Sequence, residues 1–378
     1  MEKTYYLNHE YLICLLCFVM AFVPAHRVWS GDSLRPGRHS GSTTPAWTLW
    51  LLRFQIAIPY IYAGIAKLDR DWLQGAAVQL GLQERLDVPF IGSWLQHNTA
   101  AWSIVYGGLL FDLPIVPCLL WPRTRMAAFA IAALFHTINA VLFDIGVFPW
   151  LMIAATTLFL PPDWPRRAMR FGGRNQASDQ RPAVEITEPV AAAEKDPNTA
   201  TVFVLLLFVV VQLLVPFRHH LYPGNPSWTG EGDNFAWRMM LNHKRGGVAF
   251  HAVKPGTSQR LPIDVRPMLS RFQYRRLISD PDLILQLAHR LSEGFQKDGF
   301  ENFEIHAVAL VSLNGRRPQL LIDPELDLSQ EQRSMFHRPF VLPLTEAVPE
   351  QLWNVPVRDW AEDFPELFPA ATEDAGSL

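Results

Sequence analysis

The chain has 378 residues, 49% of them hydrophobic, with a mean hydropathy of +0.07 and a formal net charge of −3. It is too apolar for an ordinary soluble protein of this size and too polar for one wholly in lipid, so we expect a membrane part and a soluble part. The small net charge excludes a bulk affinity for nucleic acid, and no nucleic-acid partner is expected. The three cysteines lie in apolar segments and are interpreted as small buried hydrophobic residues, with no metal site expected.

Apolar segments are predicted at 11–25, 46–66, 99–121, 126–143, 145–160 and 200–217. A full membrane span needs about 20 residues, and the second, third and sixth segments reach or approach that length. The first and fifth are short, which suits a tilted, re-entrant or partly shielded helix. We therefore predict a transmembrane helical domain over 1–160 and a last transmembrane helix over 200–217.

Loop charges predict the orientation. Arginines are frequent in the loop 26–45, in the turn after Trp121 and in 161–174, whereas the loop 67–98 is acidic on balance. The positive-inside rule places the arginine-rich loops in the cytoplasm and everything after residue 217 outside. Residues 161–199 are largely polar and rich in Ala and Pro, so they are predicted to be a cytoplasmic linker.

Residues 218–378 are predicted to form an extracytoplasmic domain. A helix is expected from Pro281, with Asp280 as its N-cap. Strand patterns occur at 248–256 and 303–323, and Asn314-Gly315 indicates a hairpin turn. The predicted fold class is a polytopic α-helical membrane domain followed by a β-rich domain, α+β and sandwich-like.

Polar side chains occur in or beside the apolar segments, where burial is costly: Asn8, His9, Lys67, Asp112, and His136 with Asn139 one helical turn away. Each has a structural alternative. Asp112 can tie two helices together by a hydrogen bond, and His136 with Asn139 can form an interhelical polar contact. Lys67 is either an anchor at the level of the lipid headgroups or a base at the edge of an apolar cavity. A pocket open to the outside would collect several of these groups.

Motifs in a fixed order add a family resemblance. The stretch "YAGIAKLDRDWLQG", 62–75, resembles the lysine segment of vitamin K-dependent gamma-glutamyl carboxylases, and "LNHEYL" resembles their Asn-His motif. Later family segments are similar to "GGLLFDL", "FHTINAVLFDIGVFPWLMIA", "LLVPFRHHLYPGNPSWTGEGDNFAWRMML", "LIDPELDL" and "DFPEL", in the same order. The chain looks like a bacterial-type homologue that lacks the first transmembrane helices of the family. Two interpretations stay open: the start is misplaced, or the chain is a fragment or degraded copy.

The resemblance implies an enzyme that couples oxidation of vitamin K hydroquinone, or menaquinol, to its 2,3-epoxide with gamma-carboxylation of protein glutamate. The co-substrates would be dioxygen and carbon dioxide. The partners would be a glutamate-containing protein or peptide, the lipid bilayer and its quinone, and the location a bacterial inner membrane. Two alternatives stay open: quinol epoxidation without carboxylation, and a non-enzymatic membrane protein that retains the fold.

The resemblance also implies residue roles. Lys67 falls on the catalytic base, and Asn8 and His9 fall beside the reacting centre. Cofactor-binding roles are expected for His136, His219, Asp112 and Asn139, and substrate-binding roles for Trp228, Trp237 and Lys244. A base must lose its proton, and burial of an amine in a low-dielectric site disfavours its charged form. Asp69 and Asp71 would oppose this if they faced the amine, so both are predicted to point away, as a helix cap or a surface pair.

Overall fold

The computed structural model describes residues 6–24, 44–89, 91–143, 145–165, 167–168, 199–254, 256–257, 259–300 and 303–364. Most of the predicted linker 161–199 and of the loop 26–45 lies outside these ranges. The described residues form two compact units. Unit 1 draws on 1–11, 62–113 and 216–378, and unit 2 on 12–61 and 114–215. Each unit is described by itself below.

Helices occupy all the predicted apolar segments. They are α1 (Asn8–Met20), α2 (Ala46–Ala66), α6 (Asn98–Leu120), α7 (Arg125–Leu142), α8 (Phe148–Thr156) with η4 (Thr157–Phe159), and α10 (Thr199–Leu214) with η5 (Val215–Leu221). Four helices in the described ranges are long and apolar enough to cross a membrane: Ala46–Ala66, Asn98–Leu120, Arg125–Leu142 and Thr199–Leu221. Asn8–Met20 and Phe148–Phe159 are apolar but shorter, as the sequence predicted.

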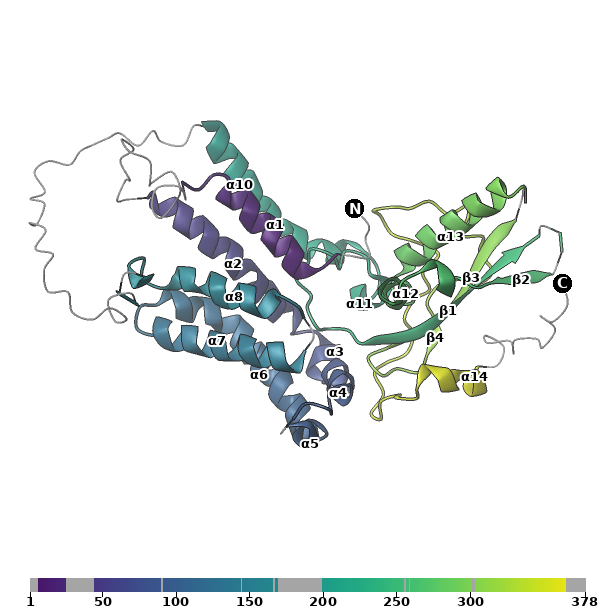
Figure 1. Ribbon diagram of the computed structural model, residues 1–378, viewed down its shortest axis with the longest axis horizontal. Helices are drawn as coiled ribbons and strands as arrows, with labels where there is room; N and C mark the ends of the chain where they lie inside the picture. Colours follow the sequence, from purple (N-terminus) through teal and green to yellow (C-terminus); the bar gives the residue numbers. More distant parts are fainter. Residues whose placement is uncertain are drawn as a thin grey trace, which may run out of the picture. The chain divides into compact units, whose positions relative to one another are not determined.

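Unit 2 has an apolar cluster where α1, α2 and α10 meet (Figure 1). Val19 of α1, Leu51 of α2 and Phe208 of α10 are buried together, and Phe18 stacks on Phe208 with ring centroids 5.2 Å apart. Helices α7 and α8 pack against one another in the same unit. One sequence interpretation is wrong, because Cys14 and Cys17 are exposed on α1 rather than buried.

The segment after α2 is more ordered than the loop that the sequence predicted. It forms three short helices, α3 (Arg70–Leu73), α4 (Ala76–Gln83) and α5 (Gly92–Leu95). Asp69 caps α3, because its side chain accepts a hydrogen bond from the backbone N–H of Asp71. Gly75 precedes α4 with φ of 73°, a left-handed conformation that suits glycine. These turns carry the chain from the end of α2 to the start of α6.

The C-terminal region of unit 1 contains one antiparallel sheet of four strands, in the order β2-β1-β3-β4. The strands are β1 (Lys244–Val253), β2 (Arg260–Ile263), β3 (Glu304–Leu313) and β4 (Gln319–Leu320). Asn314 and Gly315 both have positive φ in the turn after β3, and the N–H of Arg316 bonds to Leu313 O at 3.1 Å, which confirms the predicted hairpin turn. No second sheet faces this one within the described ranges, so the sandwich-like arrangement is not confirmed.

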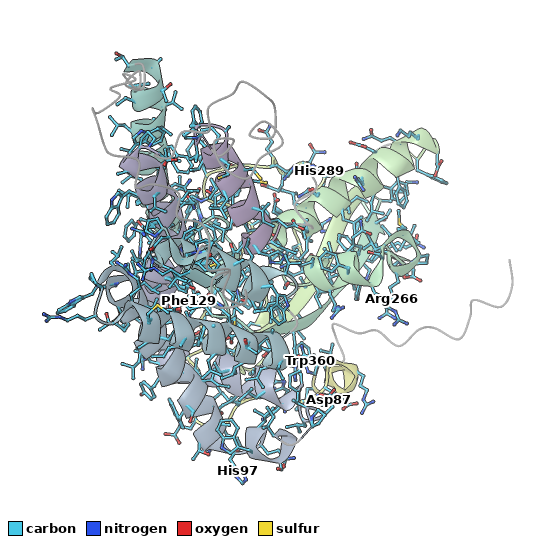
Figure 2. The ribbon with its side chains drawn as sticks, turned by 60° about the vertical axis from the view of Figure 1, so that its left-hand side comes forward. Asp87, His97, Phe129, Arg266, His289 and Trp360 are labelled. Carbon is cyan, nitrogen blue, oxygen red and sulfur yellow. The ribbon has the colours of Figure 1, made fainter. Side chains whose placement is uncertain are left out.

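Helices complete this region. They are α11 (Pro226–Thr229), α12 (Arg271–Leu277), α13 (Pro281–Lys297) and α14 (Trp360–Asp363), with short turns η6 (Arg266–Met268) and η7 (Val357–Asp359). Helix α13 packs its apolar face on β3, and Asp280 caps it as predicted (Figure 1). Trp360, labelled in Figure 2, is fully buried, and its indole N–H donates to Val355 O at 3.0 Å. The chain beyond β4 is therefore held by specific contacts despite its irregular backbone.

Candidate functional site

Lys67 is buried at the end of α2, with only 7% of its surface exposed. Its amine forms an ion pair with the carboxylate of Asp112, from the middle of α6. The Nζ atom also lies 5.3 Å from the centre of the Trp72 ring. Opposite the stem is Gly108, where a Cβ atom would lie 3.5 Å from Cε of Lys67. The lysine stem thus lies between α3 and a small residue of α6, which places the amine on Asp112.

Trp72 fixes the turn that carries Lys67. Its side chain is 1% exposed, and its indole N–H donates to Val105 O on α6 at 3.2 Å. Because α3 starts at a capped Asp69 and is held by this tryptophan, the backbone around Lys67 has little freedom. The amine is therefore presented by a fixed segment, as a site that depends on positioning requires.

Asp71 makes a second buried ion pair, with Arg316 from the turn after β3. The guanidinium donates to both carboxylate oxygens at 2.7 and 2.8 Å, and Asn314 Nδ2 donates at 3.1 Å. Burial alone would raise the pKa of Asp71, but Arg316 and Asn314 more than offset it, so the pKa lies below its ordinary value. Asp69 is a helix cap, as predicted. The prediction of a surface position for Asp71 is wrong, since only 7% of it is exposed.

The start of α1 packs on the loop 230–241. The Tyr6 hydroxyl donates to Asn8 Oδ1 at 2.9 Å and accepts the Phe235 N–H at 2.8 Å. Tyr11 stacks on Trp237 with centroids 5.3 Å apart. Asn8 and its neighbour His9 are half-buried at this contact. The structure thus places the Asn-His segment beside the loop that contains Trp237, while their catalytic roles remain predictions.

His219 lines a pocket of about 280 Å³ in unit 1. The last turns of α2 provide an apolar wall, including Tyr62, Ile65 and Leu68, and Asp69 and Arg238 add polar groups. The Nδ1 atom of His219 lies 2.8 Å from Pro216 O, which fixes the ring. Lys67 does not line this pocket, although Ala66 and Leu68 on either side of it do. The amine therefore faces Asp112 and not the pocket in this state.

His136 belongs to a buried polar chain in unit 2. Its Nε2 atom lies 2.8 Å from the Tyr60 hydroxyl, which in turn lies 3.1 Å from Thr156 Oγ1. This chain joins α2, α7 and α8, so His136 is an interhelical polar contact, one of the alternatives that the sequence left open. Asn139 is half-buried one turn further along α7. Because these residues lie in unit 2, they are not placed relative to Lys67 or His219.

The predicted substrate-binding residues have structural partners. Trp228 is fully buried in the core of the sheet region and donates its indole N–H to Leu342 O at 2.7 Å. Lys244 donates to the carbonyls of Trp228 and Ser279 at 2.8 and 2.9 Å. Trp237 is also fully buried, and its indole N–H has no hydrogen-bond partner. Of the three, Trp237 alone presents a free polar atom that a ligand or water would satisfy.

Sequence reasoning missed several polar groups. Arg316 and Tyr60 gave no signal, because a sequence does not show which distant residues meet. Gln55 is fully buried in α2, and neither of its amide atoms is hydrogen-bonded. A polar residue within an apolar run is a signal of a costly buried group, so the sequence could have identified Gln55. Among the residues that the structure describes, no group of three or more His, Cys, Asp or Glu side chains is placed to hold a metal ion.

These features define a class: a protein with several helices long and apolar enough to cross a membrane, a sheet-containing C-terminal region and a buried lysine–carboxylate pair. Comparison with known proteins is more specific. The model of the HTTM domain matches residues 1–164, and the model of the vitamin K-dependent gamma-carboxylase lumenal domain matches residues 197–347. The chain is a homologue of the gamma-carboxylase family.

One bacterial relative is distant in sequence. The chain is 28% identical over 142 residues to "Uncharacterized protein YitO" of Bacillus subtilis (strain 168), which covers 35% of this chain and 46% of that protein. It thus matches less than half of the length of that curated relative. No solved structure matches the chain.

Proposed function

We propose that this protein uses vitamin K hydroquinone, or menaquinol, with dioxygen and carbon dioxide to gamma-carboxylate glutamate residues of a protein or peptide. The observation that carries the proposal is the buried Lys67 amine on Asp112, in a segment that resembles the lysine motif of the family. The proposed location is a bacterial inner membrane, with residues 218–378 extracytoplasmic. The proposed domains are 1–160, 161–199, 200–217 and 218–378.

Lys67 is the proposed base, and Asp112 is its proposed proton partner rather than a quinol ligand. Transfer of one proton from the ammonium to the carboxylate leaves a neutral amine and a neutral acid. A low-dielectric site tolerates this neutral pair better than two separated charges. The neutral amine can then take a phenolic proton over a short distance. Lys67 has a flexible four-carbon stem, which allows the amine to turn from Asp112 toward a bound ligand.

The His219 pocket is the proposed quinol headgroup site. Its apolar wall suits an aromatic ring, and His219 supplies a polar atom for one of the oxygens. Its volume of about 280 Å³ is close to the lower end, roughly 300 Å³, of typical ligand pockets. When bound there, vitamin K hydroquinone with dioxygen would supply the strong base that carboxylation of glutamate requires. The protein residues bind, orient and deprotonate, and the apolar wall excludes water.

A second candidate is quinol epoxidation without carboxylation, and one contact favours it. Arg238 pairs with Asp233 at 3.1 Å and with Ser227 at 3.0 Å, and its side chain is only 5% exposed. This arginine, in the segment that resembles the glutamate-substrate region, is already occupied by an internal carboxylate. A substrate carboxylate would have to displace Asp233 to bind there.

One experiment separates these functions. The full chain in lipid nanodiscs is supplied with vitamin K hydroquinone, a short glutamyl peptide and radiolabelled carbon dioxide. Epoxide together with acid-stable label in the peptide supports carboxylation, while epoxide alone supports the second candidate. Absence of both products from a folded sample, with menaquinol as well as vitamin K hydroquinone, would contradict both and favour a non-enzymatic membrane protein.

A further inference from the structure

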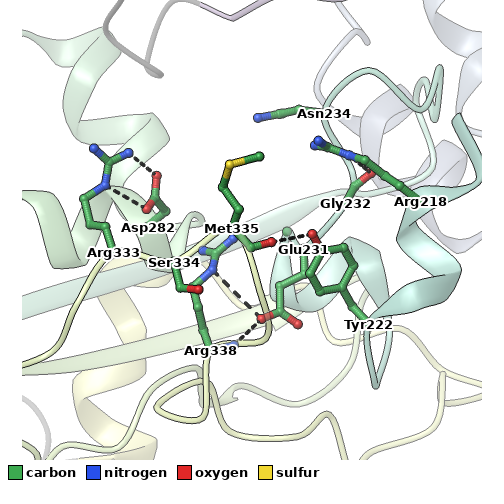
Figure 3. A pocket seen from close by; sticks show the side chains of 11 residues that line it. Arg218, Tyr222, Glu231, Gly232, Asn234, Asp282, Arg333, Ser334, Met335 and Arg338 are labelled. Atoms are coloured by element: carbon green, nitrogen blue, oxygen red, sulfur yellow. Dashed lines mark hydrogen bonds and ion pairs between the residues drawn. The ribbon is translucent and has the colours of Figure 1, made fainter. Parts of the chain in front are cut away.

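A second pocket in unit 1, the arginine pocket, has a volume of about 350 Å³ and lies at the junction of η5 with the sheet region (Figure 3). Arg218 of η5 and Arg333 and Arg338 of the loop after β4 line it, together with the carboxylates of Glu231 and Asp282. Three guanidinium groups face two carboxylates, so the lining carries an excess positive charge. None of these residues takes part in the proposed quinol chemistry.

The arginines are not equally occupied. Arg333 uses both carboxylate oxygens of Asp282, at 3.2 and 3.1 Å. Arg338 is 8% exposed, and its Nε and Nη1 atoms have no hydrogen-bond partner, because Glu231 accepts instead from its backbone N–H at 2.6 Å. Its Nε lies 3.9 Å from Glu231, too far for a hydrogen bond. A buried guanidinium with unused donors is costly unless a ligand or water satisfies it. Planar donors of this kind match phosphate oxygens.

Strongly exposed apolar side chains belong to the lining of the arginine pocket or to sequence neighbours of its lining residues. Met335 and Phe336 are each 81% exposed, and Leu221, the last residue of the candidate span Thr199–Leu221, is 83% exposed. The Tyr222 hydroxyl donates to Met335 O, which fixes this tip beside the end of the span (Figure 3). Exposed apolar side chains close to the end of a candidate membrane span, next to a basic pocket, match the acyl region of a lipid beside its headgroup. A hydrated peptide would leave these three side chains in water.

We propose that the arginine pocket binds the phosphate of an anionic phospholipid, with Met335 and Phe336 against its acyl chains. Arg338 would turn its unused donors, which are enclosed in this structure, toward the phosphate. Arg218, whose Nε otherwise makes one long contact, 3.5 Å, to Gly232 O, would bind the phosphate as well. The excess positive charge of the lining selects an anionic lipid over a zwitterionic one. The lipid would thereby hold the sheet region at the membrane surface.

The test uses the purified full chain in nanodiscs of phosphatidylcholine with increasing phosphatidylglycerol, and native mass spectrometry of the lipids retained. Phosphatidylglycerol should be retained in preference to phosphatidylcholine. Arg338→Gln and Arg218→Gln should each weaken this preference about tenfold, the loss expected for a charge-assisted hydrogen bond. The control Arg260→Gln removes an exposed arginine paired with Glu325 and should change nothing. If Arg338→Gln does not fold, Arg218→Gln decides the result.

Two further arms distinguish the sources of the anion. Inorganic phosphate at millimolar concentration should displace little phosphatidylglycerol, and Met335→Ser with Phe336→Ser should weaken lipid retention. Equal retention of the two lipids, or an unchanged preference in folded Arg218→Gln, would overturn the proposal. Full displacement by inorganic phosphate, with no effect of the two serine substitutions, would assign the pocket to a soluble anion instead.

Discussion

The substitution Lys67→Arg separates a base from an anchor. Arginine keeps a positive charge, and its planar fork can still bond to Asp112, so the ion pair and the fold should persist. A base must release its proton, and arginine effectively cannot. If Lys67 is the base, epoxide formation should fall about 10²–10⁴-fold, equivalent to roughly 2.7–5.4 kcal/mol in the activation free energy. An anchor would change activity only a few-fold.

The structure makes arginine more informative here than alanine. Lys67→Ala would leave Asp112, which is 4% exposed, as a buried carboxylate without its partner. Breaking a buried pair typically costs about 3–5 kcal/mol, so an inactive alanine variant could simply be unstable. The assay is epoxide formation from vitamin K hydroquinone by equal amounts of folded protein in nanodiscs. Lys297→Arg, at the exposed end of α13, is the matched control and should be fully active.

If the full-length active protein with Lys67→Arg retains more than roughly a tenth of wild-type epoxidation, the loss is too small for a general base. Lys67 would then be a structural partner of Asp112, and the proposed role would be withdrawn. Equal losses of epoxidation activity in Lys67→Arg and Lys297→Arg would instead indicate a defect of the protein preparation. The two variants would then be expressed again and compared in samples of matched thermal stability.

The other predictions concern stability, its pH dependence and membrane orientation. Asp71→Asn should lower the unfolding free energy by about 3–5 kcal/mol, because its guanidinium partner, Arg316, stays buried and charged. Asp69→Asn should leave the unfolding free energy nearly unchanged, because aspartate and asparagine are both good N-cap residues. As the pKa of Asp71 is lowered in the fold, thermal melts of Asp71→Asn and wild type should converge as the pH falls below about 4. Gly232→Ala places a Cβ 2.5 Å from a backbone atom, whereas Gly230 has the same positive φ but open space around the position of a Cβ. The Gly232→Ala variant should therefore melt at a markedly lower temperature than the Gly230→Ala variant. Equal melting temperatures would refute this. Reporter fusions at residue 175 and at the C-terminus should report the cytoplasm and the outside respectively, and agreement between the two would end the orientation model.

Local patterns were sufficient for much of the fold. The apolar helices, the Asp280 cap and the Asn314-Gly315 turn depend on neighbours in the sequence, and each was predicted from them. The short helices after α2 were not, because α3 and α5 have only four residues each and depend on packing. The sandwich-like arrangement is not confirmed: the buried Leu321 and Ile322 after β4 add only an isolated bridge, from Ile322 to Val341, to the four-stranded sheet.

The site was predictable only in part, for a physical reason. A lone lysine beside an apolar run reveals a costly group, but not the partner that makes its burial tolerable. Asp112 was identified separately as costly, and only folding shows that the two form one pair. Arg316 lies 245 residues from Asp71 and looked like an ordinary turn arginine. Such distant pairs leave no periodicity in one sequence.

The loop 230–241 has a further consequence. Phe235, Trp237 and Met240 have φ values of 64°, 56° and 63°, a left-handed conformation that costs a non-glycine residue of order 1–3 kcal/mol. The rest of the fold holds this backbone in place, with Trp237 fully enclosed and Tyr11 stacked on it. A ligand that reaches this loop meets a surface already shaped, so little conformational entropy is lost on binding. Glycine at any of the three positions would relieve the backbone strain but would also increase the conformational freedom of the loop. Each ligand would then have to order the loop on binding, at a cost in conformational entropy.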